Sequence, residues 1–135
     1  MITVEEADTY FSTRLRVDAW NQALAANRVK AIFMATEIVD RLVMEEYTSG
    51  EYPVDYPIDL KDAVCEITLK LLDGFDIEQA QNDLRIQSEK AGGVVTTYNS
   101  ERKEHIFRGV PSLIAWRLMR AYMDDPSTVR MDRVS

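Results

Sequence analysis

Apolar residues recur every three or four positions in several stretches of the chain, which is the spacing of one face of an α-helix. The two clearest stripes are Ile32, Ala35, Val39 and Leu42, and Leu60, Val64, Ile67 and Leu71. A chain of 135 residues is long enough to bury such stripes in one core. The sequence therefore predicts a mainly α fold, a small bundle of four to five helices that forms a single domain over residues 1–124.

Capping patterns indicate where the first helices begin. Thr3 and Glu6 have the S/T-x-x-E spacing of a capping box, so a first helix is expected to run from there to about Arg14. A second helical region is expected over 18–44, with a break near Asn27, which is a suitable N-cap for the longer half. The first third of the chain is thus predicted to be helical with one interruption.

The third helix is predicted over 60–72, with Asp59 as its N-cap and Gly74 as its C-terminal stop. Cys65 lies beside the apolar stripe of this helix and is followed by the acidic Glu66. A reactive thiol needs a basic environment, so Cys65 is expected to be a small buried residue of the core.

The stretch after the third helix is predicted to contain the β structure of the fold. A short helix is expected to end at about Asp83. Beyond it, the segments LRIQSEK and VVTTY flank Gly92 and Gly93. A Gly-Gly pair between two alternating segments is a hairpin signal, so we predict a β-hairpin near residues 84–98.

The last predicted helix opens at Pro111 and runs to about Met123. Its apolar residues point in nearly every direction, and Arg117 and Arg120 form one narrow polar stripe. Four apolar residues exceed what one core face can absorb: Leu113, Trp116, Met119 and Met123. The second side of this helix is therefore expected to meet a neighbouring subunit or a partner protein.

Residues 125–135 are predicted to be a flexible, extended C-terminal tail that carries Arg130 and Arg133. Charge is unevenly distributed between this end and the rest of the chain. Residues 111–135 hold four arginines and three aspartates, which leaves 12 basic and 20 acidic residues before them, a net charge of −8. An acidic body with an arginine-bearing arm favours head-to-tail packing or docking onto another protein.

A long acidic segment, residues 45–57, contains Gly50 and two prolines and is predicted to be a loop. It carries Tyr47, Tyr52 and Tyr56 among acidic residues. Loops of this length are often functional. We expect these tyrosines to face a neighbouring subunit or the next protein of an assembly, and a solvated loop is the alternative.

Several classes of function are excluded or disfavoured by what the sequence contains. Cys65 is the only cysteine, so an intramolecular disulfide and a multi-cysteine metal site are impossible. The only histidine, His105, lies in an expected polar loop over 99–109. Phosphate-loop, HExxH, CxxC and GxSxG motifs are absent, so we expect no enzyme, no catalytic or metal-binding residues and no cofactor. No stretch reaches the about 18 apolar residues that span a bilayer, so no membrane association is expected.

Four segments follow one another in the order and spacing of one protein family. They are ITVEEADTYFSTRL, then DAWNQA with KAIFMATEIVDRL, then PIDLKDAVCEITLKLLDG, and finally LRIQSEKAGGVVTTY. The matching residues include Tyr10, Phe11, Trp20, Thr36, Asp40, Glu66, Ser88, Gly92 and Tyr98. In these segments the chain resembles the head-tail connector, or adaptor, proteins of tailed phages, some of which are labelled DnaT-like single-stranded DNA-binding proteins.

The resemblance implies a structural protein of the virion. Such proteins assemble under the portal as a homo-oligomeric ring, a dodecamer by resemblance, after synthesis in the host cytoplasm. The ring extends the channel for double-stranded DNA without binding it specifically, and it provides the platform for the next tail, stopper or nozzle protein. The interface with the portal or with neighbouring subunits would then involve the C-terminal arm: Leu113, Trp116, Arg117, Met119, Arg120, Met123, Arg130 and Arg133.

A single-stranded DNA-binding replication accessory module is the alternative. Trp20, Tyr98 and Trp116 would then be stacking platforms for bases. The net charge of −7 disfavours this function, because binding to nucleic acid depends on Lys and Arg that displace counterions from phosphates. The two tryptophans are expected to be anchors of the core or of an interface.

Overall fold

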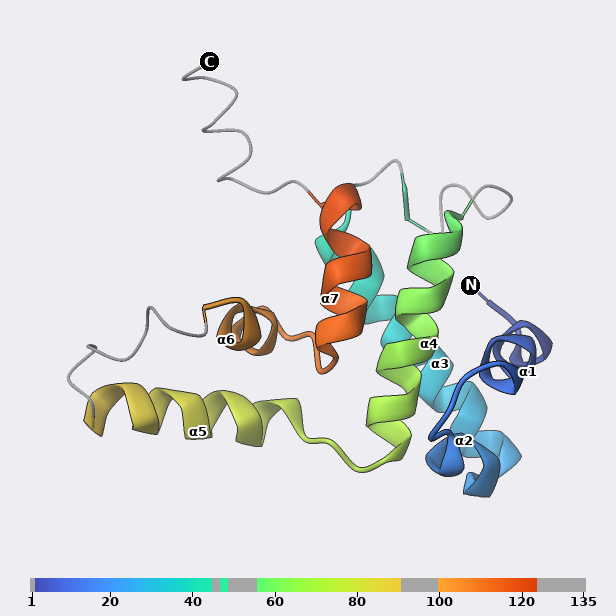
Figure 1. Ribbon diagram of the computed structural model, residues 1–135, viewed down its shortest axis with the longest axis horizontal. Helices are drawn as coiled ribbons and strands as arrows, with labels where there is room; N and C mark the ends of the chain where they lie inside the picture. Colours follow the sequence, from blue (N-terminus) through green and yellow to red (C-terminus); the bar gives the residue numbers. More distant parts are fainter. Residues whose placement is uncertain (1, 45–46, 49–55, 91–99, 124–135) are drawn as a thin grey trace, which may run out of the picture.

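The computed structural model describes residues 2–44, 47–48, 56–90 and 100–123, with side chains throughout except at 87–90 and 100–103. These residues are mainly helical, as predicted (Figure 1). The helices are α1 (Val4–Ser12), α2 (Asp18–Gln22), α3 (Ala25–Leu42), α4 (Ile58–Leu72), α5 (Ile77–Lys90), α6 (Ser100–Phe107), α7 (Leu113–Met119) and the 3-10 helix η3 (Arg120–Tyr122). The expected tail, 125–135, lies outside the described residues.

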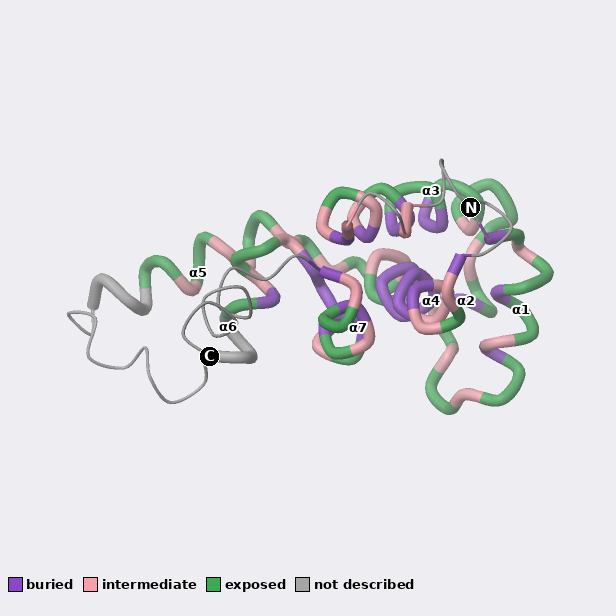
Figure 2. Tube along the Cα trace, turned by 90° about the horizontal axis from the view of Figure 1, so that it is seen from above, coloured by how far each residue is buried: buried purple, intermediate pink, exposed green. Residues whose placement is uncertain are grey.

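Helix α4 is the centre of the bundle, and α3 and α7 pack most extensively against it. Figure 2 shows α4 buried around its circumference, whereas α3 and α7 are buried on the sides that face it. Its fully buried side chains are Leu60, Ala63, Val64, Ile67 and Thr68. Helices α1 and α2 cover a further side of α4, so α4 becomes the common core of four others.

The capping box at the start of α1 is confirmed. The Thr3 hydroxyl accepts the backbone N–H of Glu6 at 3.2 Å, and the Thr3 N–H donates to the Glu6 carboxylate at 3.3 Å. Gly74 is also confirmed as the stop of α4, since it has a φ of +88°, a region that suits glycine. The backbone N–H of Phe75 then reaches the carbonyl of Lys70 at 3.1 Å and closes the last turn.

Two predicted N-caps are wrong. Helix α3 begins at Ala25, after Leu24, which makes no side-chain cap, so Asn27 lies inside the helix. Helix α4 begins at Ile58, after Pro57, and Asp59 lies in its first turn. In both cases an extended residue before the helix sets the start, and the acidic Asp59 still suits the positive end of the helix.

The predicted β-hairpin near 84–98 is wrong over its first strand, because α5 continues through Lys90. The Asp76 carboxylate caps this helix by accepting the N–H groups of Glu78 and Gln79 at 3.0 and 3.2 Å. Glu, Gln, Ala, Leu, Arg and Lys, which favour helices, fill most of α5 and outweigh the short alternation of polar and apolar residues. Residues 91–98, the rest of the predicted hairpin, lie outside the described residues.

The predicted polar loop over 99–109 is also wrong, since α6 occupies most of it and His105 is buried. Gly109, with a φ of +88°, ends this helix, and the N–H of Val110 bonds to the carbonyl of His105 at 2.8 Å. The chain then turns into α7, which Ser112 caps by accepting the N–H of Ala115 at 3.2 Å. Pro111 therefore precedes the helix instead of opening it.

Helices α5 and α6 form an arm that projects from the bundle (Figures 1 and 2). The half-buried residues of α5 are Ile77, Ala80, Gln81 and Leu84, which lie on one helical stripe. The Gln81 side chain donates to the carbonyl of Ile106 at 2.9 Å and so ties α5 to the end of α6. The rest of the described surface of α5 is exposed, which is the pattern of a helix that one neighbour covers on one side.

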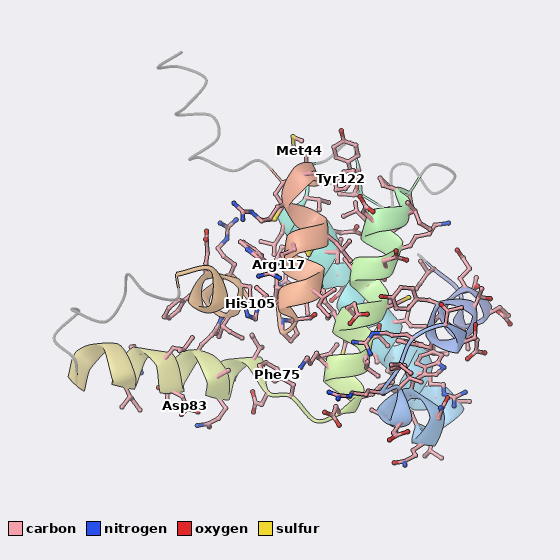
Figure 3. All side chains as sticks on the ribbon, viewed as in Figure 1. Met44, Phe75, Asp83, His105, Arg117 and Tyr122 are labelled. Carbon is pink, nitrogen blue, oxygen red and sulfur yellow. The ribbon has the colours of Figure 1, made fainter. Side chains whose placement is uncertain are left out.

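The end of α3 meets the end of η3 at the top of the bundle. Val43 and Met123 form an isolated antiparallel bridge, and the N–H of Met44 donates to the carbonyl of Tyr122 at 2.9 Å. Figure 3 shows Met44 and Tyr122 together at this end. The Tyr122 hydroxyl also donates to Asp59 on α4 at 3.1 Å, so three elements are joined there.

Candidate functional site

A cleft of about 410 Å³ lies between α1 and the first half of α4. Its lining residues are Ile2, Glu6, Thr9, Tyr10, Thr13, Ile58, Lys61, Asp62 and Cys65. Ile58 at its edge is 68% exposed, which is unusual for an isoleucine in a helix. The cleft thus combines apolar surface with both signs of charge.

A buried carboxylate, that of Glu66, is bonded to Tyr10 in the wall of this cleft. Glu66 on α4 is 3% exposed and accepts hydrogen bonds from the Arg14 guanidinium, at 2.5 Å from Nε and 2.9 Å from Nη2. The Tyr10 hydroxyl donates to the same carboxylate. Burial and the neighbouring Glu66 raise the pKa of Tyr10, so it remains a neutral donor at physiological pH. The network fixes α1 on α4.

Charges at the rim of the α1–α4 cleft are only partly balanced. Lys61 pairs with Glu6 at 3.1 Å, and this hydrogen bond lowers the pKa of Glu6. Partial burial, followed by the nearby Asp59 and Glu66, raises the pKa of Asp62. Among the described residues no cation forms an ion pair with Asp62. The rim therefore carries a surplus of negative charge at Asp62.

Cys65 is 2% exposed, as the sequence predicted, and burial raises the pKa of its thiol to about 12. Because the thiolate is the reactive form, we expect native Cys65 to react with an aromatic disulfide reagent at pH 8 roughly 100-fold or more slowly than the denatured protein. The release of the coloured thiol measures both rates. A Ser12→Cys variant provides an exposed control thiol, and fast reaction of the native wild-type protein would show that the cleft opens to the core.

A second, much smaller niche lies between α6 and α7. Glu104, Arg108, Trp116, Arg120 and Met123 line it, and its volume is about 10 Å³. The guanidinium of Arg108 lies over the Trp116 ring, 5.7 Å from the centroid. The buried Nε1 of Trp116 has no hydrogen-bond acceptor in the described part of the chain. The α6–α7 niche therefore contains both a positive charge, that of Arg108, and an unsatisfied hydrogen-bond donor, the indole N–H of Trp116.

His105 lies next to this niche, on the side of α6 toward α7 (Figure 3). It is 7% exposed, and its Nδ1 is 2.6 Å from the carbonyl oxygen of Val110. This contact is local, five positions along the chain, and it holds the turn between the two helices. The arrangement gives His105 a structural role.

The predicted C-terminal interface residues divide into a buried and an exposed group. Trp116, Met119 and Met123 are buried in the core of the chain itself, and Leu113 is half-buried. The predicted surplus of apolar surface is therefore wrong for most of this helix, because α4 and α6 absorb it. Arg117 and Arg120 are exposed, as is Ile114, while Arg130 and Arg133 lie outside the described residues.

The three tyrosines predicted to form a contact surface have different environments. Tyr56 is buried and its hydroxyl is 3.4 Å from the Asp40 carboxylate, so it belongs to the core. Tyr47 packs edge-on against Tyr122, with the ring centroids 5.1 Å apart, and stays partly exposed. Tyr52 lies outside the described residues. Of the two that are described, only Tyr47 can present surface to a partner.

The outer face of α3 is an apolar surface that was not predicted from the sequence. Val29, Phe33 and Met34 are each 52% exposed there, and Leu24 just before the helix is 71% exposed. The signal was present in the sequence, because these residues lie outside the core stripe formed by Ile32, Ala35 and Val39. This face adds a second apolar surface to the molecule.

The described tryptophans do not offer stacking surfaces to bases. Trp20 is 1% exposed and Trp116 is 3% exposed. Both are core residues, which confirms the expectation that they act as anchors. Tyr98, the third residue considered for stacking, lies outside the described residues.

No group of His, Cys, Asp and Glu side chains in the described ranges could hold a metal ion. None of the helices searched there is long and apolar enough to cross a membrane. Comparisons with models of protein families, with curated proteins and with solved structures gave no match.

Proposed function

We propose that the protein is a structural subunit of a tailed-phage virion. In this role it is a head-to-tail adaptor that forms a ring under the portal, extends the DNA channel and provides the attachment platform for the tail. The ring is a dodecamer by resemblance to the adaptor family. The protein acts without catalysis or a cofactor.

The observation that carries this proposal is the projection of the α5–α6 arm from the bundle (Figure 1). One stripe of α5 is half-buried, and the described residues on its other sides are exposed. A projecting helical arm with this little cover is typical of subunits that interlock, because contact with a neighbour buries what the subunit leaves exposed. The segments that resemble adaptor proteins make a ring the form of assembly that we propose.

The charge distribution supports passage of DNA without tight binding. The first 110 residues carry the net charge of −8, and phosphates are repelled by such a surface. A channel through which DNA must slide needs weak contacts with the phosphate backbone. An acidic body meets that requirement.

The charge of the C-terminal arm and the acidic segment 45–57 support an assignment of the partners. We assign the portal, or a neighbouring subunit, to the exposed arginines of the C-terminal arm, Arg117 and Arg120, together with Arg130 and Arg133 of the tail. Paired with carboxylates of the portal, these arginines would contribute more to specificity than to affinity. We assign the next tail protein to the acidic segment 45–57, where Tyr47 is partly exposed.

Electron microscopy of virions tests the proposal. In particles purified from a phage that encodes this chain with an affinity tag, we expect gold-labelled antibody at the single vertex where head and tail meet. Particles that carry the untagged chain are the control for labelling. Reconstruction of the same particles should show a ring of this chain beneath the portal.

The outcomes that contradict the proposal are equally direct. Absence of the chain from purified virions would exclude a structural role. Sub-micromolar binding of the free protein to single-stranded DNA, with a steep dependence on salt, would support the replication accessory module instead.

A further inference from the structure

The indole N–H of Trp116 is a buried donor that no described residue satisfies. The residue is 3% exposed, and its Nε1 finds no acceptor among the residues that the structure describes. Trp20 provides the contrast, since its indole N–H donates to the Asp8 carboxylate at 2.7 Å. Buried N–H groups in folded proteins are nearly always paired, so Trp116 indicates a position that something outside the described residues fills.

The niche around Trp116 defines what kind of atom fits there. A volume of about 10 Å³ has room for roughly one water-sized atom, such as a single oxygen. Arg108 and Arg120 line the niche beside the indole, and Glu104 is the only acidic side chain in the lining. In the lining of this niche, hydrogen-bond donors thus outnumber acceptors. The chemistry favours a carboxylate oxygen, which accepts from an indole and a guanidinium together.

A second copy of this chain is the most suitable source of that carboxylate. Residues 1–110 carry a net charge of −8, whereas the niche is lined by arginines, so two copies are complementary when the niche of one meets the body of the next. Both views place α6 and α1 at opposite ends of the bundle (Figures 1 and 2). Surfaces at opposite ends pair head to tail, which closes into a ring when the rotation allows.

The acidic surface at the far end is the rim of the α1–α4 cleft. Asp62 lies there, half-buried and without a cation in ion-pair contact among the described residues. The exposed Ile58 and the cleft of about 410 Å³ lie beside it. Apolar area next to an unbalanced carboxylate is the combination expected of a contact surface for a partner that brings arginine.

We propose that the α6–α7 niche of one copy, formed by Arg108 and the Trp116 indole, binds the Asp62 carboxylate at the α1–α4 cleft of the next copy. The contact rests on the proposed ring, and it names the two surfaces that join its subunits. Each copy then offers one niche and one carboxylate. Every Trp116 N–H gains an acceptor and every Asp62 gains a cation.

Charge reversal tests this pairing with the full-length protein. We expect Arg108→Glu or Asp62→Lys alone to weaken self-association roughly tenfold or more, as sedimentation equilibrium measures it. An equimolar mixture of the two variants should associate again, because each wild-type surface meets its partner and the two reversed charges meet each other. Matched reversals at exposed positions away from both surfaces and from the α5–α6 arm, Lys70→Glu and Asp73→Lys, should leave association unchanged.

The two indole N–H signals in a nuclear magnetic resonance spectrum give an independent measure. As the protein concentration rises, the Trp116 signal should shift downfield and its exchange with solvent should slow, since the N–H gains an acceptor. The Trp20 signal is an internal control, because its N–H is already bonded to Asp8. The Trp116→Phe variant assigns the signals.

Distinct outcomes separate this contact from the proposed function. If the single variants associate like the wild type, or the mixture fails to recover, the contact is wrong even when virions contain a ring of this chain. If virions lack the chain, the function is wrong even when the two variants complement each other in solution. Circular dichroism verifies that each variant is folded, and the milder Arg108→Gln and Asp62→Asn replace any that is not.

Discussion

Replacing Trp20 by alanine is expected to lower the free energy of unfolding by about 4 kcal/mol, within the range for large aromatic residues truncated in a core. Trp20 is 1% exposed and packs against Phe11, with the ring centroids 4.8 Å apart. The Arg28 guanidinium lies over the indole at 4.9 Å and also donates to the carbonyl of Trp20. Alanine removes all the contacts of the ring at once and leaves a cavity between α1, α2 and α3. Urea denaturation followed by circular dichroism measures the loss.

Two further variants separate the contributions at this position. Trp20→Phe keeps an aromatic ring but removes the hydrogen bond to Asp8, so it should cost less than half as much as alanine. Leu15→Ala is the matched surface control, because Leu15 is 85% exposed, and it should change stability by no more than about 0.5 kcal/mol. A Trp20→Ala loss as small as that of the surface control would mean that α2 does not pack as described.

Replacing Arg14 by alanine should destabilise the protein by about 3 kcal/mol, the lower end of the cost of leaving one partner of a buried ion pair unpaired. Glu66 is 3% exposed and, of the bonds that the described residues make to it, would then keep the one from Tyr10. Lys61→Ala is the matched control. It breaks the pair with Glu6, whose side chain is 44% exposed, and should cost no more than about 1 kcal/mol.

A double variant identifies the cause of the Arg14 effect. Glu66→Gln removes the charge that needs a cation, so Arg14→Ala combined with Glu66→Gln should recover at least half of the loss. The same urea titrations provide the measurement. Strictly additive losses in the double variant would show that Arg14 stabilises the protein through the packing of its aliphatic part and not through Glu66.

Local signals account for the parts of the fold that were predicted from the sequence. The Thr3–Glu6 box, the stop at Gly74 and the stripes of α3 and α4 each depend on residues within about three turns of one another. Their structural outcome is largely fixed before the chain folds back on itself. For the same reason the burial of Cys65 could be inferred from its place beside the α4 stripe.

Apart from the two N-caps, which are local errors, the wrong predictions concern places where distant contacts contribute to the structure. The length of α5 depends partly on the bond from Gln81 to Ile106, 25 positions along the chain, and the Gly-Gly signal gave no information about it. The local sequence predicts that His105 lies in a loop. Its burial depends on the packing of α7 against α6, which the local sequence does not show. The excess apolar surface of α7 was overestimated, because periodicity within one helix does not show how many neighbours it has.

The network at Glu66 shows a signal that could have been used. Glu66 lies inside the run from Ala63 to Leu69, in which every residue is buried. A carboxylate in such a run needs a cation or several donors, so a partner could have been sought in the sequence. Its identity could not, because Arg14 is 52 positions away and reaches Glu66 only when α1 packs on α4.

The bridge between Val43 and Met123 also determines how the molecule bears tension. A force that pulls on the chain after Met123 acts first on this bridge, on the Met44–Tyr122 bond and on the Tyr122–Asp59 bond. Through Asp59 the load passes directly into α4, the helix with the most buried side chains. The α5–α6 arm precedes α7 in the sequence, so it is not on the path by which this force reaches α4. A pull at this end would therefore strain the core before it displaced the arm.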